Sequence, residues 1–285
     1  MPPFRSAAVL LPAFLGCLAC AGPLPGTAPL TVEGDLSVRM VQGIDRWLDR
    51  ETGNLDRRRE ETWKAQTASA DAWAETAEVR RADLAKMIGA VDPRRPGALQ
   101  RIADAGAEHP AAVADGYTVE AVTWPVFDGV NGEGLLLRPA GPAKAAVIVL
   151  PDADQTPEQS AGLQPGSSAD LQFARRFAEL GFLVVTPALV DRRDKWSGNE
   201  KLKRYTNASH REWIHRQSFE VGRTVPGFET QKVLAAVDAL KGASAKLLAD
   251  GAKIGVAGYG EGGLIAMNAA AIDPRIDAAF VHGYF

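Results

Sequence analysis

The chain has 285 residues, of which 46% are hydrophobic and 24% are charged, and its formal net charge is −3. This composition is ordinary for a soluble globular protein, and the length allows one large domain or one domain with an appendage. The charge balance shows no basic excess, which argues against nucleic acid as a partner.

Residues 1–21 have the pattern of an export signal. Arg5 supplies the positive charge, and the apolar core at residues 7–18 is too short to span a bilayer. The sequence Ala-Cys-Ala at residues 19–21 fits the rule for signal peptide cleavage, so the mature protein is expected to begin at Gly22. This leader predicts a periplasmic or extracellular protein.

Both cysteines of the chain, Cys17 and Cys20, lie in this leader. A mature chain without cysteine suits an oxidising compartment and excludes thiol catalysis and cysteine-ligated metals. The alternative is a lipoprotein that is anchored to a membrane through one of these two residues. No segment of the chain predicts a membrane span.

The region before residue 116 is predicted to hold a linker and a helical arm. Residues 22–35 are rich in Gly and Pro, as linkers are, and residues 36–115 form the helical N-terminal region. Its apolar residues at helical spacing are Met40, Ile44, Trp47 and Leu48, and the further tryptophans are Trp63 and Trp73. These tryptophans either stack on sugars or anchor the arm on the next domain.

Residues 116–285 carry the pattern of an α/β domain. An antiparallel pair is predicted at 117–124 and 132–138, with a turn at Asp128 and Gly129. Buried strands are predicted at 145–150, 182–186, 253–257 and 276–281, and amphipathic helices at 171–180 and 232–240. Strands that alternate with helices indicate a mostly parallel sheet with helices on both faces.

The sequence G-Y-G-E-G-G at residues 258–263 follows a buried strand and opens a helix, and it has two interpretations. The first is the dinucleotide fingerprint G-x-G-x-x-G. That motif belongs on the first strand of its unit, with an acidic residue at the end of the next strand. Here two buried strands come first and the next strand ends at His282, so dinucleotide binding is the weaker alternative.

The second interpretation is the nucleophile elbow G-x-S-x-G, with Gly260 in place of the serine. Residues 256–263, V-A-G-Y-G-E-G-G, are similar to the V-x-G-x-S-x-G-G sequence of the acetyl xylan esterase and dienelactone hydrolase branch of the α/β-hydrolases. The resemblance covers residues 117–285. It implies carboxylic-ester or acyl-carbohydrate substrates and an oxyanion hole formed by the amides of Ala153 and Glu261. No cofactor or metal is expected.

The chain departs from that family in two ways. Gly260 has no side chain and cannot form an acyl-enzyme, although glycine relaxes this strained turn. The family's catalytic acid and histidine follow the elbow in the order Ser, Asp or Glu, His, and the chain stops at Phe285 before either can be assigned. We therefore predict that the sequence is incomplete at its C-terminus.

Three carboxylates are candidates for the same site. Glu261 either complements the dipole of the following helix or projects into the region where the family has its oxyanion hole. In the second case it would act as an acid, a base or a ligand contact. Asp152 and Asp154 follow a neighbouring strand, and they are either solvated loop residues or part of the same pocket. Paired carboxylates would support acid–base chemistry.

The histidines give weaker signals. His210 and His215 are five residues apart, so on a helix they do not share a metal-binding face as an i, i+4 pair would. One of them enters the pocket or both are structural. His282 ends a predicted strand, but not at the position where the family has its histidine.

The sequence thus predicts an exported α/β-hydrolase-like protein of the carboxylic-ester lineage, without serine-type catalysis, whose partner is a small-molecule or carbohydrate ester. The first alternative is a non-catalytic protein that binds a carbohydrate or metabolite on the same fold. The second is an enzyme that uses Glu261, Asp152 and a histidine without a covalent serine.

Overall fold

The computed structural model describes residues 25–28, 31–64, 69–102, 112–166, 168–196, 198–199, 204–205 and 208–284. The predicted leader, with Cys17 and Cys20, lies outside these residues, as does the side chain of Trp63. The chain forms two compact units, Met1–Thr67 and Ala68–Phe285. No helix among the described residues combines the length and the apolar character needed to cross a bilayer.

The first unit contains the helices α1 (Leu36–Gly53) and α2 (Leu55–Lys64). Asp35 caps α1, because its side chain accepts a hydrogen bond from the amide of Ser37 at 2.8 Å. α1 is strongly amphipathic, and none of its residues is buried.

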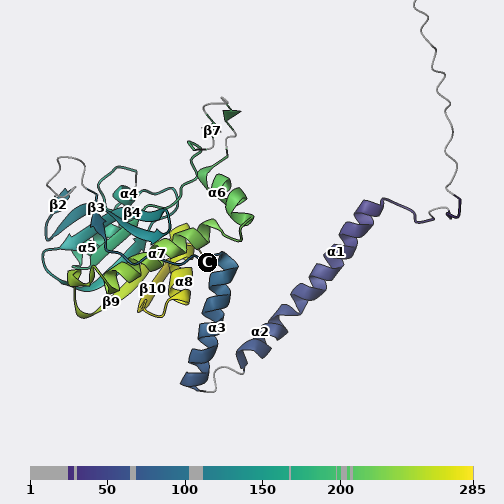
Figure 1. The fold of residues 1–285 in the computed structure, drawn as a ribbon, viewed down its shortest axis with the longest axis horizontal. Helices are drawn as coiled ribbons and strands as arrows, with labels where there is room; N and C mark the ends of the chain where they lie inside the picture. The colour runs from purple at the N-terminus through teal and green to yellow at the C-terminus, as the bar shows by residue number, and fades with distance from the viewer. Residues whose placement is uncertain are drawn as a thin grey trace, which may run out of the picture. The chain divides into compact units, whose positions relative to one another are not determined.

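The second unit is built on an eight-stranded sheet in the order β1-β3-β4-β6-β5-β9-β10, with β2 paired to β3 (Figure 1). The strands of this sheet are β1 (Gln100–Arg101), β2 (Ala112–Ala114), β3 (Tyr117–Phe127), β4 (Val130–Pro139), β5 (Ala143–Leu150), β6 (Leu183–Pro187), β9 (Leu248–Tyr259) and β10 (Ala278–His282). β7 (Gly198–Asn199) and β8 (Arg204–Tyr205) form a separate small ribbon. The strands from β6 through β5 and β9 to β10 are parallel, and those before them are antiparallel.

This sheet confirms the predicted fold class. The turn between β3 and β4 lies at Asp128 and Gly129 as predicted, with Gly129 at a φ of 73°. β1 and β2 fall within residues 36–115, yet they pair with β3. The second compact unit begins at Ala68 and so includes β1 and β2.

Helices cover both faces of the sheet. The helices that contact the sheet are α4 (Pro157–Ser160), α5 (Phe173–Glu179), α7 (Val225–Lys241) and α8 (Glu261–Ile272). Two further helices pack on these, because α3 (Ala70–Ile88) lies against α7 and α8, and α6 (His210–Phe219) lies against α7. Short 3-10 turns lie at Ala169–Leu171 and Ala245–Leu247. α7 is longer than the predicted 232–240. Thr224 caps its start by accepting a hydrogen bond from the amide of Gly227 at 3.1 Å.

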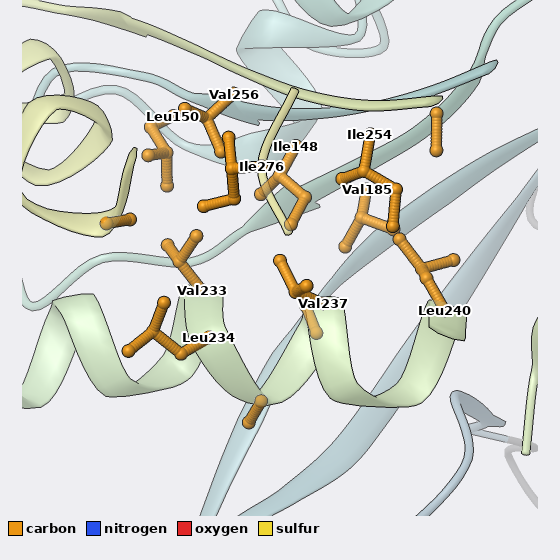
Figure 2. Close-up of a cluster of buried hydrophobic side chains, with 14 of the residues drawn as sticks. Ile148, Leu150, Val185, Val233, Leu234, Val237, Leu240, Ile254, Val256 and Ile276 are labelled. Carbon is orange, nitrogen blue, oxygen red and sulfur yellow. The ribbon is translucent and has the colours of Figure 1, made fainter. Parts of the chain in front are cut away.

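The core has one cluster on each face of the sheet, because successive residues of a strand point to opposite sides. Ile148 and Leu150 of β5 belong to one cluster, and Val147 and Val149 belong to the other. Figure 2 shows the first cluster, in which side chains of α7 point at those of the sheet. Burial on both faces explains why these strands are continuous apolar runs.

Candidate functional site

The carboxyl ends of the parallel strands place the candidate residues together. β5 ends at Leu150, β6 at Pro187 and β9 at Tyr259, and these three strands are neighbours in the sheet. The loops that leave these ends carry the residues from Asp152 onward and from Ala188 onward, and β9 leads directly into α8. Ligand sites of open α/β sheets lie at this edge.

The turn between β9 and α8 has the strand–turn–helix geometry of a nucleophile elbow. Gly260 adopts a φ of 56° and a ψ of −123°, a conformation that L side chains rarely adopt. Its amide donates a hydrogen bond to the carbonyl of His282 at 2.9 Å. A Cβ atom on Gly262 would overlap the carbonyl oxygens of Leu150 and Pro151, so the turn packs against the end of β5.

Asp152 fills the space in front of Gly260. Its Oδ1 accepts a hydrogen bond from the amide of Glu261 at 2.9 Å. A Cβ atom built on Gly260 would lie 2.7 Å from this Oδ1 and 2.9 Å from Cγ, which is too close for a side chain to fit unless Asp152 moves. The carboxylate therefore stands where a serine would project, and it already bonds one of the two amides that the resemblance assigns to the oxyanion hole.

The carboxylate of Glu261 is held by two arginines. Its Oε1 accepts a hydrogen bond from Arg211 of α6, and its Oε2 accepts one from Arg192 at 2.8 Å. Arg192 also donates to Asp154 at 2.6 Å, and this bond raises the pKa of the guanidinium above its ordinary value. Because both oxygens of Glu261 bind guanidinium groups, the side chain is engaged in a structural network at the start of α8.

The loop that carries Arg192 is held in place by side chains of α7. Glu229 is 1% exposed, and its Oε1 accepts a hydrogen bond from the amide of Val190 at 2.7 Å. It also forms an ion pair with Lys232, whose Nζ donates to the carbonyl of Ala188 at 2.7 Å. These hydrogen bonds join side chains of α7 to the backbone of the loop at Val190 and Ala188. They hold in place the segment from which Arg192 extends.

The remaining oxyanion candidate, Ala153, is buried at 3% exposure. It lines a cavity of about 320 Å³ together with Asp154 and Leu189. Asp152, Asp154 and Glu261 thus lie around one edge of the sheet as the sequence indicated. Their carboxylates, however, bind an amide and arginines of the chain itself.

The histidines lie in different surroundings. His210 Nδ1 is 2.7 Å from Asp191 Oδ1, and its Nε2 accepts a hydrogen bond from the amide of Trp196 at 3.1 Å. Burial works to raise the pKa of Asp191, but hydrogen bonds from Arg193 and His210 hold that pKa below its ordinary value.

His215 and His282 each lie against an aromatic ring. The ring of His215 is 5.8 Å from that of Phe219, and the ring of His282 is 5.6 Å from that of Tyr259. The described part of the chain holds no group of three His, Cys, Asp or Glu side chains that would bind a metal ion.

A second hollow lies beside α6, and we call it the α6 groove. It has a volume of about 720 Å³ and is lined by Leu189, Trp196, His210, Trp213, Ile214 and Phe228 among others. Sequence reasoning missed this groove, because its aromatic residues come from a loop, from α6 and from α7. The only signal was the concentration of tryptophan and histidine between residues 196 and 215.

The sheet order and the strand–turn–helix geometry at Gly260 define an α/β-hydrolase fold. Residues 133–284, more than half of the chain, match the dienelactone hydrolase family. The chain belongs to this family. A search of curated protein sequences found no match.

The chain is similar to solved structures of esterases. A candidate acetyl xylan esterase from Bacteroides fragilis is 18% identical with a TM-score of 0.52, and the match covers 73% of this chain and 53% of that one. A glucuronoyl esterase from Solibacter usitatus is 16% identical with a TM-score of 0.46, and the match covers 74% and 59%. This chain therefore spans little more than half the length of these proteins.

Proposed function

We propose that this chain is a member of the ester-hydrolase lineage whose elbow does not perform serine-type hydrolysis. One observation carries the proposal, namely that the carboxylate of Asp152 occupies the space in front of Gly260 and binds the amide of Glu261. Serine-type catalysis needs an activated hydroxyl and free N–H donors for the oxyanion. Here glycine removes the hydroxyl, and a negative charge lies where an oxyanion would form.

A fluorophosphonate probe tests this proposal, because it labels only activated serines. The unmodified chain should remain unlabelled. The variant Gly260→Ser should also remain unlabelled while Asp152 is present. The double variant Gly260→Ser/Asp152→Ala makes room for the hydroxyl and frees the amide, so labelling is expected only there and only if a base reaches the serine.

Heat-denatured protein is the control for unspecific reaction with the probe. Strong labelling of the unmodified chain, mapped by peptide mass spectrometry to Ser209 or Ser218, would show that a different serine is the nucleophile. Labelling of the single Gly260→Ser variant at the same level as the double variant would show that Asp152 does not block the site.

We also propose that the protein is exported and that its mature chain begins at Gly22, because residues 1–21 have the pattern of a cleavable leader. Mass spectrometry of the protein recovered from a bacterial host should give an N-terminus at Gly22. A lipid-modified Cys17 or Cys20 at the N-terminus would mean a lipoprotein, and an intact leader would contradict export.

The α6 groove favours a second candidate function, the binding of a ring-containing ligand without catalysis. Trp196, Trp213 and Phe228 line it, and the Asp191–His210 pair supplies polar groups. Pockets of this kind bind ligands through apolar area and aromatic stacking, with a few polar groups to orient the ligand. Given the lineage, the ligand class is a sugar ring or its ester.

Tryptophan fluorescence measures such binding directly. Acetylated and unacetylated xylo-oligosaccharides are the probes, and either should change the emission of the unmodified chain in a saturable way. Trp213→Ala should abolish the change, whereas Trp73→Ala on α3, a residue that is 45% exposed, should preserve it. Absence of a saturable change, or its survival in Trp213→Ala, would exclude the groove as the binding site.

A further inference from the structure

The helix α1 carries an apolar stripe that the described residues of its own unit leave uncovered. Six large apolar side chains form this stripe, and each is between 50% and 64% exposed, namely Leu36, Met40, Val41, Ile44, Trp47 and Leu48. At about 100° per residue they fall on one side of the helix. An isolated helix of 18 residues is only marginally stable in water, and such helices gain their stability by packing an apolar face against a partner.

The charges of α1 lie on opposite sides of this stripe. Asp45 and Asp49 fall on one flank, and Arg39, Arg46 and Arg50 fall on the other. With Glu51 at the end of the stripe, the helix has three basic and three acidic side chains and so no net charge. A helix that lies on a membrane surface carries an excess of Lys and Arg on its polar face, so this pattern does not favour a lipid partner.

We propose that the stripe of α1 pairs in parallel with the same stripe of a second copy of this chain. A two-fold axis along the helices places the acidic flank of each helix beside the basic flank of its partner, on both sides of the contact. An antiparallel pair would place acidic flank beside acidic flank and basic flank beside basic flank. The parallel arrangement is therefore the one in which the charges of the two flanks pair with opposite charges, and only Glu51, at the end of the stripe, faces a like charge.

The mass in solution tests the pairing. The unmodified chain should give twice its mass of 30.3 kDa in sedimentation or light scattering. Ile44→Asp in the middle of the stripe should give the single mass, and Gln42→Asp on the opposite face is the matched control that should keep the double mass. A single mass for the unmodified chain, or equal behaviour of the two variants, would overturn the proposal.

Engineered cysteines test the orientation without disturbing the apolar residues. Ser37 and Glu51 lie within the stripe at its two ends, and the native cysteines Cys17 and Cys20 are first replaced by serine. In a parallel pair, Ser37→Cys should form a disulfide dimer with itself under mild oxidation. Cross-linking only in a mixture of Ser37→Cys and Glu51→Cys would mean an antiparallel pair. Binding of the chain to neutral lipid vesicles, with no cross-link in the single variant or in the mixture, would mean a lipid partner. An antiparallel pair and a lipid partner would each contradict the proposal.

Discussion

At the scale of the residue, the turn before α8 depends on glycines that have no room for a side chain. A Cβ atom on Gly262 would overlap the carbonyl oxygens of Leu150 and Pro151, which are backbone atoms at the end of β5 and cannot rotate away. Gly255, earlier on β9, differs, because a Cβ atom there would be 3.5 Å from the carbonyl oxygen of Ala278, an ordinary contact. These two glycines of one strand–turn–helix unit therefore have different roles.

We expect Gly262→Ala to lower the free energy of unfolding by about 1–3 kcal/mol, the usual cost of overpacking. Gly255→Ala should change it by less than about 1 kcal/mol, since the methyl group fits and alanine lowers the entropy of the unfolded chain. Urea unfolding followed by circular dichroism measures both values. Equal losses of unfolding free energy in the two variants would show that the close contacts at Gly262 do not exclude a side chain from the turn.

The sequence predicted the turn at Gly260 but not the contact of the Asp152 side chain. The pattern of residues 256–263 was sufficient to place Gly260 in the turn and Glu261 at the start of α8, because local glycine spacing sets this geometry. The contact of Asp152 with the amide of Glu261 joins residues 109 positions apart. Its side-chain direction depends on how β5 and β9 pair, and no local pattern encodes it.

At the scale of the element, the segment that follows α3 is tied to α7 by a polar contact. Asp92 accepts hydrogen bonds from Arg223 at 2.7 and 3.3 Å, and its amide donates to Gln231, a fully buried residue of α7, at 3.1 Å. The hydrogen bond from Arg223 is the main reason that the pKa of Asp92 lies below its ordinary value of 3.8. The ionised carboxylate therefore stabilises the folded state.

This contact gives an expected pH dependence. Because the folded pKa of Asp92 is lowered, its contribution is fully present above pH 3.8 and is lost as the pH falls through the folded pKa. We expect Asp92→Asn to be less stable than the unmodified chain at neutral pH and to approach it below 3.8. Asp128→Asn, at a surface pair with a 98% exposed carboxylate, is the control that should change little. A constant difference for Asp92→Asn across the pH range would contradict this account.

Element positions were largely predictable where hydrophobic patterns are strong. The run at 145–150 lies within β5, and the run at 182–186 matches β6 to within one residue. Ends defined by polar contacts were less predictable. β9 begins at Leu248, five residues before the predicted 253, because the exposed residues Asp250 and Gly251 interrupt the apolar run in its first half.

At the scale of the whole molecule, the sheet has an open side at β10. Among the described residues β10 pairs only with β9, and most of its side chains are exposed. Phe280 is 55% exposed, and beneath it lies an apolar hollow of about 270 Å³ that Phe177 and Phe182 also line. An unpaired strand edge with apolar side chains is a template for pairing with another chain.

We therefore expect the chain to aggregate through β10 when it is concentrated, and Phe280→Lys to reduce this aggregation. A lysine on an edge strand disfavours edge-to-edge pairing. When two such edges pair, the like charges of the two lysines come together and lose their hydration. Leu180→Lys is the matched control, since Leu180 is 74% exposed but follows α5 and lies on no strand edge. Static light scattering against concentration measures the effect. Equal reduction of aggregation by both variants would show that added positive charge, and not the edge of β10, governs aggregation. No reduction by Phe280→Lys would place the contact between chains elsewhere on the surface.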